Sequence, residues 1–64
     1  MAKKHVDHTV NFTKENGNTA TAEVLTDGKV DITIKTPNNI TILHHYDNVD
    51  AMQNEMAAMN YNMI

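Results

Sequence analysis

Five apolar side chains near the end of this chain recur at helical spacing, and this pattern constrains the fold more than any other. They are Val49, Met52, Met56, Met59 and Met63, separated by 3, 4, 3 and 4 residues. At about 100° per residue on a helix, all five fall within an arc of roughly 80°. The spacing predicts an amphipathic helix over residues 48–62 with one narrow apolar face, which needs one surface to bury it.

The residues around position 48 have the chemistry of a helix start. Asp47 is expected to cap the helix, and Asp50, three residues later, adds negative charge where the helix dipole favours it. No glycine or proline interrupts residues 48–62. The segment is therefore expected to be one uninterrupted helix.

Four β-compatible runs precede the helix, at residues 4–13, 19–26, 29–35 and 40–45. Apolar and polar residues alternate along them, as is typical of strands with one buried face. In the first run, Val6, His8, Val10 and Phe12 are expected to point one way.

The first turn favours a three-residue loop, Glu15 to Gly17, with the glycine in a left-handed bulge. A two-residue turn would place Val10 opposite a charged residue. The three-residue loop instead places Phe12 opposite Ala20 and Val10 opposite Ala22.

The second turn, at Asp27-Gly28, conflicts with the first by one residue. A two-residue turn there pairs Leu25 with Val30, whereas the first hairpin turns Val24 inward. One extra residue reverses the side-chain phase, so we expect a β-bulge near Val24-Leu25.

A third turn is expected at residues 36–39, where Pro37 presets φ and asparagine tolerates left-handed geometry. In the fourth strand, one face carries Ile40, Ile42 and His44, and the other carries Thr41, Leu43 and His45. Short connections favour a meander. The fold class is α+β, a four-stranded antiparallel meander (β-β-β-β-α) in one domain, residues 1–64, with the C-terminal amphipathic helix packed on one face.

This small chain is expected to self-associate. A domain of 64 residues buries only about 60% of its unfolded surface, and without cysteine it has no disulfide to stabilise it. Four strands make a face roughly 19 Å wide, whereas a helix is about 10 Å across. The uncovered part of the face predicts a homodimer.

The expected interaction surface combines the first strand with the methionine helix: Val6, Val10, Phe12, Met52, Met56, Met59 and Met63. Packing of the helix on its own sheet is the preferred interpretation. The same 3-4 spacing also suits a short coiled coil between two helices, and methionine also suits docking to another protein.

The four histidines are not expected to form a metal site. His5 and His8 point to opposite faces of a strand, as do His44 and His45. The same-face pairs, His8 with His44 and His5 with His45, lie on opposite edge strands, roughly 14 Å apart. No metal and no cofactor are expected.

The chain is not expected to be an enzyme. It has no serine and no cysteine, and its two glycines build no phosphate-binding loop. Each acidic residue has a structural explanation, in a turn, a strand or a helix start. A core this small also leaves little volume for a small-molecule substrate.

Charge and hydropathy restrict the partners further. The net charge is −3, all five basic residues are lysine and arginine is absent, so nucleic acid is not an expected partner. No run reaches the roughly 20 apolar residues of a membrane span, and the first residues do not resemble a signal peptide. The expected location is the cytoplasm.

These observations predict a small non-enzymatic protein-binding or assembly module that acts as a homo-oligomer, with a sheet edge as one candidate surface. Two alternatives remain. One is an acidic inhibitor or nucleic-acid mimic that binds a basic groove on another protein. The other is a β-ribbon DNA-binding dimer that uses Lys29 and Lys35 on the outer face.

Overall fold

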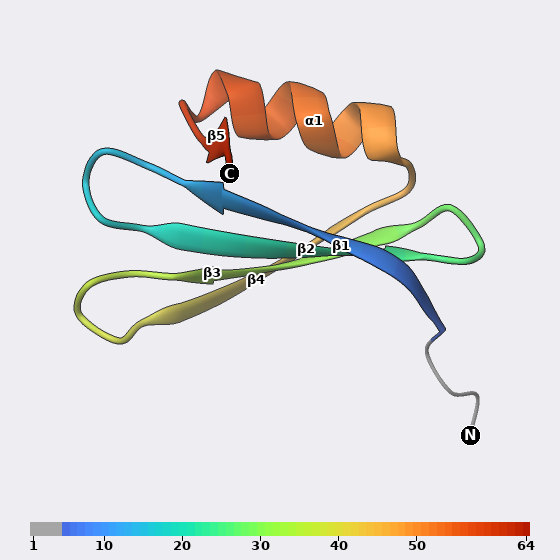
Figure 1. The fold of residues 1–64 in the computed structure, drawn as a ribbon, viewed down its shortest axis with the longest axis horizontal. Helices are drawn as coiled ribbons and strands as arrows, with labels where there is room; N and C mark the ends of the chain where they lie inside the picture. The colour runs from blue at the N-terminus through green and yellow to red at the C-terminus, as the bar shows by residue number, and fades with distance from the viewer. Residues whose placement is uncertain (1–4) are drawn as a thin grey trace.

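The computed structural model describes residues 5–64 as one antiparallel sheet covered on one face by one helix (Figure 1). The strands lie in the order β4-β3-β2-β1-β5. The elements are β1 (Val6–Thr13), β2 (Thr19–Leu25), β3 (Val30–Lys35), β4 (Thr41–Tyr46), α1 (Val49–Ala58) and β5 (Asn62–Met63). The predicted α+β class and β-β-β-β-α order are confirmed, with a short fifth strand added. The predicted start of the first strand, Lys4, lies outside the described residues.

The first hairpin has the predicted three-residue loop. Its ladder pairs Phe12 with Ala20 and Val10 with Ala22, so the predicted register is confirmed. Gly17 has a φ of 95°, the left-handed geometry that this loop requires.

The other two hairpins repeat this loop. A left-handed residue stands at positions 17, 28 and 39, at intervals of 11 residues. In each loop its N–H donates to the carbonyl three residues earlier, at 3.0 Å. The third loop has Asn39 in place of glycine. Asparagine tolerates the left-handed conformation better than most residues do. Because the three loops are alike, the strands keep one common side-chain phase.

The β-bulge predicted near Val24-Leu25 occurs at that point of the ladder, but its extra residue is not in β2. The second loop has three residues rather than two, so Val24 lies opposite Val30 and β2 needs no extra residue. The register shift lies in β1 instead, between Val6 and His8. Val6 therefore lies opposite Leu25 on the outer face, although it was expected to point inward with His8.

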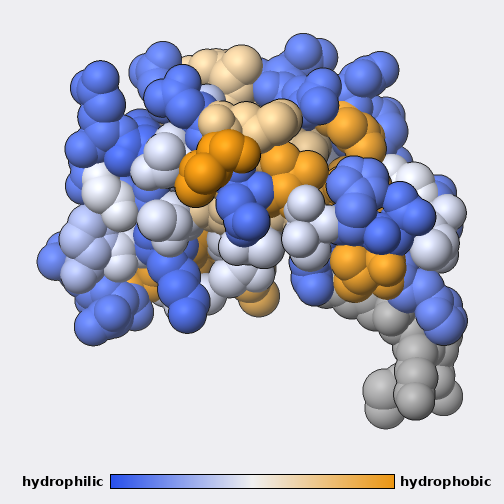
Figure 2. Space-filling view, in the orientation of Figure 1, coloured by the Kyte–Doolittle hydropathy of each residue, from blue (hydrophilic) through white to orange (hydrophobic). Residues whose placement is uncertain are grey.

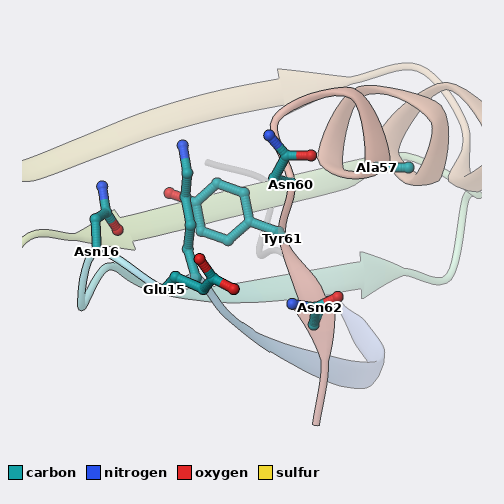
Figure 3. A pocket seen from close by; sticks show the side chains of 7 residues that line it. Glu15, Asn16, Ala57, Asn60, Tyr61 and Asn62 are labelled. Carbon is teal, nitrogen blue, oxygen red and sulfur yellow. The ribbon is translucent and has the colours of Figure 1, made fainter.

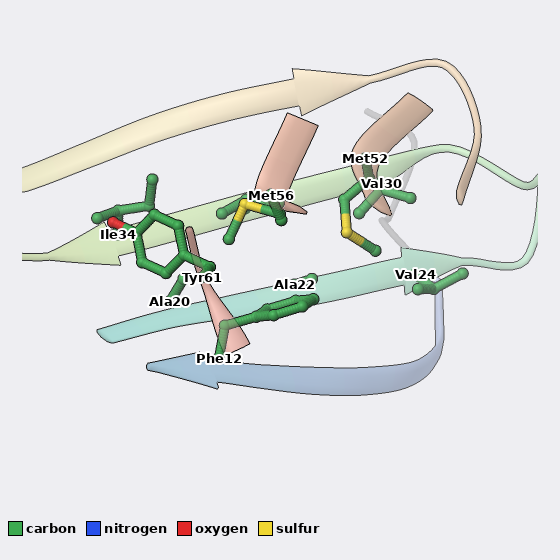
Figure 4. Close-up of a cluster of buried hydrophobic side chains, with 10 residues drawn as sticks. Phe12, Ala20, Ala22, Val24, Val30, Ile34, Met52, Met56 and Tyr61 are labelled. Carbon is green, nitrogen blue, oxygen red and sulfur yellow. The ribbon is translucent and has the colours of Figure 1, made fainter. Parts of the chain in front are cut away.

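The core lies between α1 and the inner face of the sheet (Figure 4). On β2 this face carries the small side chains of Ala20 and Ala22, which leave space for Met52, Met56 and Tyr61. The buried apolar residues are Phe12, Ala20, Ala22, Val24, Val30, Ile32, Ile34, Met52, Met56 and Tyr61.

The methionine seam faces the chain's own sheet. Met52 is 0% exposed and Met56 is 1% exposed, while Val49 and Met59 pack partly buried against the same cluster. These two methionines are therefore not free to pair with a second helix. Packing on the sheet, the preferred interpretation of the seam, is confirmed.

The helix begins one residue later than predicted and has a different cap. Asn48, not Asp47, is the N-cap, and its side-chain oxygen accepts from the Ala51 N–H at 2.8 Å. The expected position of Asp50 in the first turn is confirmed.

The helix also ends earlier than the predicted residue 62. Asn60 adopts a φ of 64°, and the Tyr61 N–H donates to the Met56 carbonyl at 3.0 Å while the Asn60 N–H donates to the Ala57 carbonyl. This pair of bonds is a Schellman ending. It turns Tyr61 back onto Met56, so both side chains share the core.

After this turn, β5 pairs with β1 and adds an unpredicted strand. Met63 lies opposite Phe12, and the Ile64 N–H donates to the Asn11 carbonyl at 2.9 Å. Met63 therefore leaves the helical seam to which the sequence pattern assigned it, and its side chain is exposed.

The cap assignment can be tested with two substitutions. Asn48→Ala should lower the free energy of unfolding by about 1 kcal/mol, because the Ala51 N–H loses its partner. Asp47→Ala should cost clearly less. Urea denaturation of both variants measures the difference, and a larger loss for Asp47→Ala would contradict the assignment.

The two glycines form a second matched pair. A Cβ on Gly17 would lie 2.9 Å from Pro37 Cγ in the third loop, whereas a Cβ on Gly28 would meet nothing within 4 Å. Both positions have positive φ, so each alanine variant should lose about 1–2 kcal/mol from backbone strain. Gly17→Ala should lose more because it must also displace Pro37. Thermal unfolding of both variants checks the order.

Candidate functional site

The free edge of β4 is the most distinctive surface of the described residues. β4 ends the sheet and pairs only with β3, from Lys35 opposite Thr41 to Val30 opposite Tyr46. In the part of the chain that the structure describes, no other strand lies beyond β4. Its outer edge is therefore open over six residues.

Alternation along the ladder shows which backbone groups face this edge. The Thr36 N–H donates to the Ile40 carbonyl at 3.0 Å, so the polar groups of Ile40 face β3. Successive residues of a strand present their polar groups to opposite sides. The N–H and C=O groups of Thr41, Leu43 and His45 therefore point away from β3, toward the open edge.

β4 lacks the features that normally protect an edge strand. Such strands usually carry lysine, proline or a bulge that prevents further pairing. Residues 41–46 read Thr-Ile-Leu-His-His-Tyr, with no proline and no lysine, and their register with β3 is regular. The edge is therefore chemically suited to accept another strand.

The opposite side of the sheet is protected. β1 has a register shift between Val6 and His8 and carries Asp7 at that point, and β5 covers its last residues. A bulge and an acidic side chain both discourage further pairing. Within residues 5–64 the two edges therefore differ, because β4 is open along its whole length whereas β1 is open only between its register shift and β5.

The side chains of β4 are apolar on both faces. On the outer face Leu43 is 74% exposed, and on the inner face Ile42 is 38% exposed because α1 does not cover it fully. Ile40, which precedes the strand, is 55% exposed. The sequence argument that one helix cannot cover four strands is confirmed at this edge.

Polar partners flank Leu43 on the outer face. The His45 ring Nδ1 and the Asp31 carboxylate lie 2.5 Å apart, and Thr33 lies opposite Leu43. A shallow depression of about 320 Å³ lies here, lined by β3 and β4 residues from Asp31 to Thr33 and from Leu43 to His45. Leucine in a rim of hydrogen-bonding groups is the composition of a small docking surface.

Tyr46, the last residue of β4, interacts with both the core and the helix. It packs half-buried against the core, and its ring lies 6.3 Å from that of His44. Burial, and then the negative charge of Glu55 on α1, raise the pKa of the Tyr46 hydroxyl above its usual value of 10.0. The hydroxyl is therefore neutral over the physiological range.

A second depression lies between the first loop and the end of the helix (Figure 3). It has a volume of about 660 Å³ and surrounds Tyr61, whose ring lies 5.4 Å from Lys14 Nζ and whose hydroxyl accepts from Asn18 Nδ2 at 3.2 Å. Lys14 and Glu15 line it with opposite charges, and Tyr61 already serves the core. The depression collects no set of like groups that would hold one ligand.

The histidines are dispersed. His8 lies on β1 beside the Asp7 carboxylate, at 2.7 Å, while His44 and His45 point to opposite faces of β4. Among residues 5–64, no group of three or more His, Cys, Asp or Glu side chains could hold a metal ion.

The predicted interaction surface is divided by the fold. Phe12, Met52 and Met56 are buried in the core and offer nothing to a partner, and Val10 and Met59 are partly buried. Only Val6 and Met63 are exposed. Figure 2 shows that apolar surface near the C-terminal end is broken into patches by hydrophilic side chains.

The expected interaction surface omitted three exposed residues of this edge, Ile40, Ile42 and Leu43. The signal that could have identified them is the run from residue 40 to 46, which has apolar side chains on both faces and no Lys, Arg, Asp or Glu. An edge strand with neither charge nor proline is uncommon unless something pairs with it.

Comparison of the chain with protein-family models, with curated proteins and with solved structures found no match. Among the described residues, no helix is long and apolar enough to cross a membrane.

The state of Tyr46 predicts a loss of stability at alkaline pH. The pKa of this hydroxyl is higher in the folded chain than in the unfolded chain, so the unfolded chain ionises first and the free energy of unfolding falls as pH rises through about 10. Tyr46→Phe should show a shallower fall between about pH 9 and pH 11. Equal slopes in urea titrations of the two proteins would contradict this assignment.

Proposed function

We propose that this chain is a non-enzymatic protein-interaction module that accepts an extended strand along the open edge of β4. The observation that carries the proposal is the regular, uncharged and unprotected ladder from Thr41 to Tyr46. Main-chain hydrogen bonds at such an edge supply affinity for any extended segment, and the alternating side chains supply specificity.

The chemistry of the edge favours a partner strand with apolar side chains. Outward polar groups on Thr41, Leu43 and His45 offer donors and acceptors at every second residue. Leu43 on the outer face and Ile42 on the inner face each supply an exposed apolar surface. A strand laid along β4 would cover both.

Inhibition of another protein by an acidic surface is less well supported. Two of the acids lie beside histidines, Asp7 with His8 and Asp31 with His45, and the others are distributed over loops, β2 and α1. A mimic of nucleic acid needs a continuous array of negative charge.

DNA binding through the outer face is also less well supported. Lys29 precedes β3 and Lys35 is its last residue, but Asp31 stands between them on the same face, with Glu23 opposite it on β2. Negative charge at the centre of the face opposes contact with phosphates.

Peptides selected from a displayed random library for binding to the intact chain test the proposed function. When added to ¹⁵N-labelled protein, they should perturb the amide resonances of Thr41, Leu43 and His45 more than those of β1. Leu43→Lys should weaken binding at least about tenfold, because a charged side chain on an edge strand discourages pairing.

A matched control is Thr9→Lys, which adds the same charge at an exposed position of β1 on the opposite side of the sheet. This variant should bind the selected peptides as the wild type does. Perturbations confined to the depression around Tyr61, or equal losses in both lysine variants, would refute strand addition at β4.

A further inference from the structure

We propose that the strand which occupies the β4 edge is the β4 strand of a second copy of this chain, paired antiparallel across a two-fold axis that passes beside Leu43. This inference rests on the proposed function and names its partner. The product is a dimer with one continuous ten-stranded sheet, five strands from each copy.

Symmetry limits the ways in which two β4 strands can pair. Antiparallel pairing of two identical edges needs a two-fold axis perpendicular to the sheet, since only this axis reverses the strand and keeps the sheet continuous. Residues directly opposite one another then belong to the same face. One residue on the axis must therefore lie opposite its own copy.

The outward backbone groups favour Leu43 as the residue on the axis. With Leu43 opposite itself, Thr41 of each copy lies opposite His45 of the other. All three outward-facing residues of β4 then meet outward-facing residues of the second strand, for about six new hydrogen bonds. If the register shifts by two residues in either direction, one of these three residues lies opposite a residue outside the β4 strand of the second copy.

The side chains agree with this register. Leu43, 74% exposed in the single chain, covers its own copy on the outer face. On the inner face Ile42 lies beside His44 of the second copy. Although each chain carries a net charge of −3, residues 40–46 contain no Lys, Arg, Asp or Glu, so no like charges are brought together within the paired strands.

Charges beside the paired strands are complementary. On the outer face Lys35 lies opposite Thr41, and Asp31 lies opposite His45. In the dimer a row across the sheet reads Lys35 and Thr41 of one copy, then His45 and Asp31 of the other. Each row thus has a positive end and a negative end, and the axis generates it twice.

The size of the contact predicts a weak dimer. A single pair of six-residue strands forms an interface near the lower end of those observed for specific complexes, below about 1,200 Å². Association is therefore expected in the micromolar range, as a concentration-dependent equilibrium.

Single cysteines test the register without interference, because the chain has no cysteine of its own. Leu43→Cys should form a covalent dimer on mild oxidation, since opposed residues have Cα atoms about 5.5 Å apart, within the range for a disulfide. Mass spectrometry and non-reducing electrophoresis measure the yield.

Two control variants separate this register from others and from chance collision. Across the proposed axis the two copies of residue 44 lie about 8 Å apart, and those of residue 41 about 14 Å apart, beyond disulfide reach. His44→Cys and Thr41→Cys should therefore crosslink far less. More crosslinking through His44→Cys than through Leu43→Cys would overturn the register.

Sedimentation of the cysteine-free chain tests the dimer itself. The wild type and Thr9→Lys should associate as the concentration rises through the micromolar range, and Leu43→Lys should remain monomeric. A wild type that stays monomeric throughout overturns the dimer. Such a monomer could still bind selected peptides at β4, so failure of the dimer and failure of strand addition are distinguishable.

Discussion

The contact of Met52 and Met56 with the small residues of β2 is the interaction on which the rest of the structure depends. Ala20 and Ala22 occupy the middle of the sheet, where larger side chains would hold the helix away from it. The long, adaptable methionines fill the space above them. Because Met52 and Met56 are the buried residues of α1, their packing decides which face of the sheet is covered and which residues remain for contact with other molecules.

The path of the chain across that face makes the two edges of the sheet different. The chain leaves the sheet at β4 and returns to it at β5, beside β1, so the segment that contains α1 crosses from one edge of the sheet to the other (Figure 1). One side thereby gains an added strand, while β4 gains none. A protein with an exposed regular edge strand is not protected against pairing with other chains. The open, uncharged edge of β4 is therefore the physical basis of the proposed interaction.

Sequence reasoning succeeded where a single local pattern decided the outcome. Alternation identified four strands, and avoidance of a charge opposite Val10 selected the first loop. It failed where two local signals competed. Asp27-Gly28 is typical of a two-residue turn, but it also fits a three-residue loop of the kind that ends at Gly17. The three-residue loop keeps Val24 pointing inward. Asn48 and Asp47 are both good N-cap residues, so the sequence alone does not choose between them. Asn60 has a low helix propensity and also tolerates the left-handed conformation that ends the helix.

By itself the sequence determined the order of the first four strands and the helix, the buried face of β3 and the one-sided helix, because each depends on periodicity within a few residues. Only the tertiary structure decided where the helix ends, that Met63 joins β1, and that Leu43 and Ile42 remain exposed. These outcomes depend on contacts between residues far apart in the chain, such as Met63 with Phe12. The residue type shows that a side chain is apolar, and local periodicity predicts which face it occupies. Its burial depends on where the helix and Tyr61 lie across the sheet.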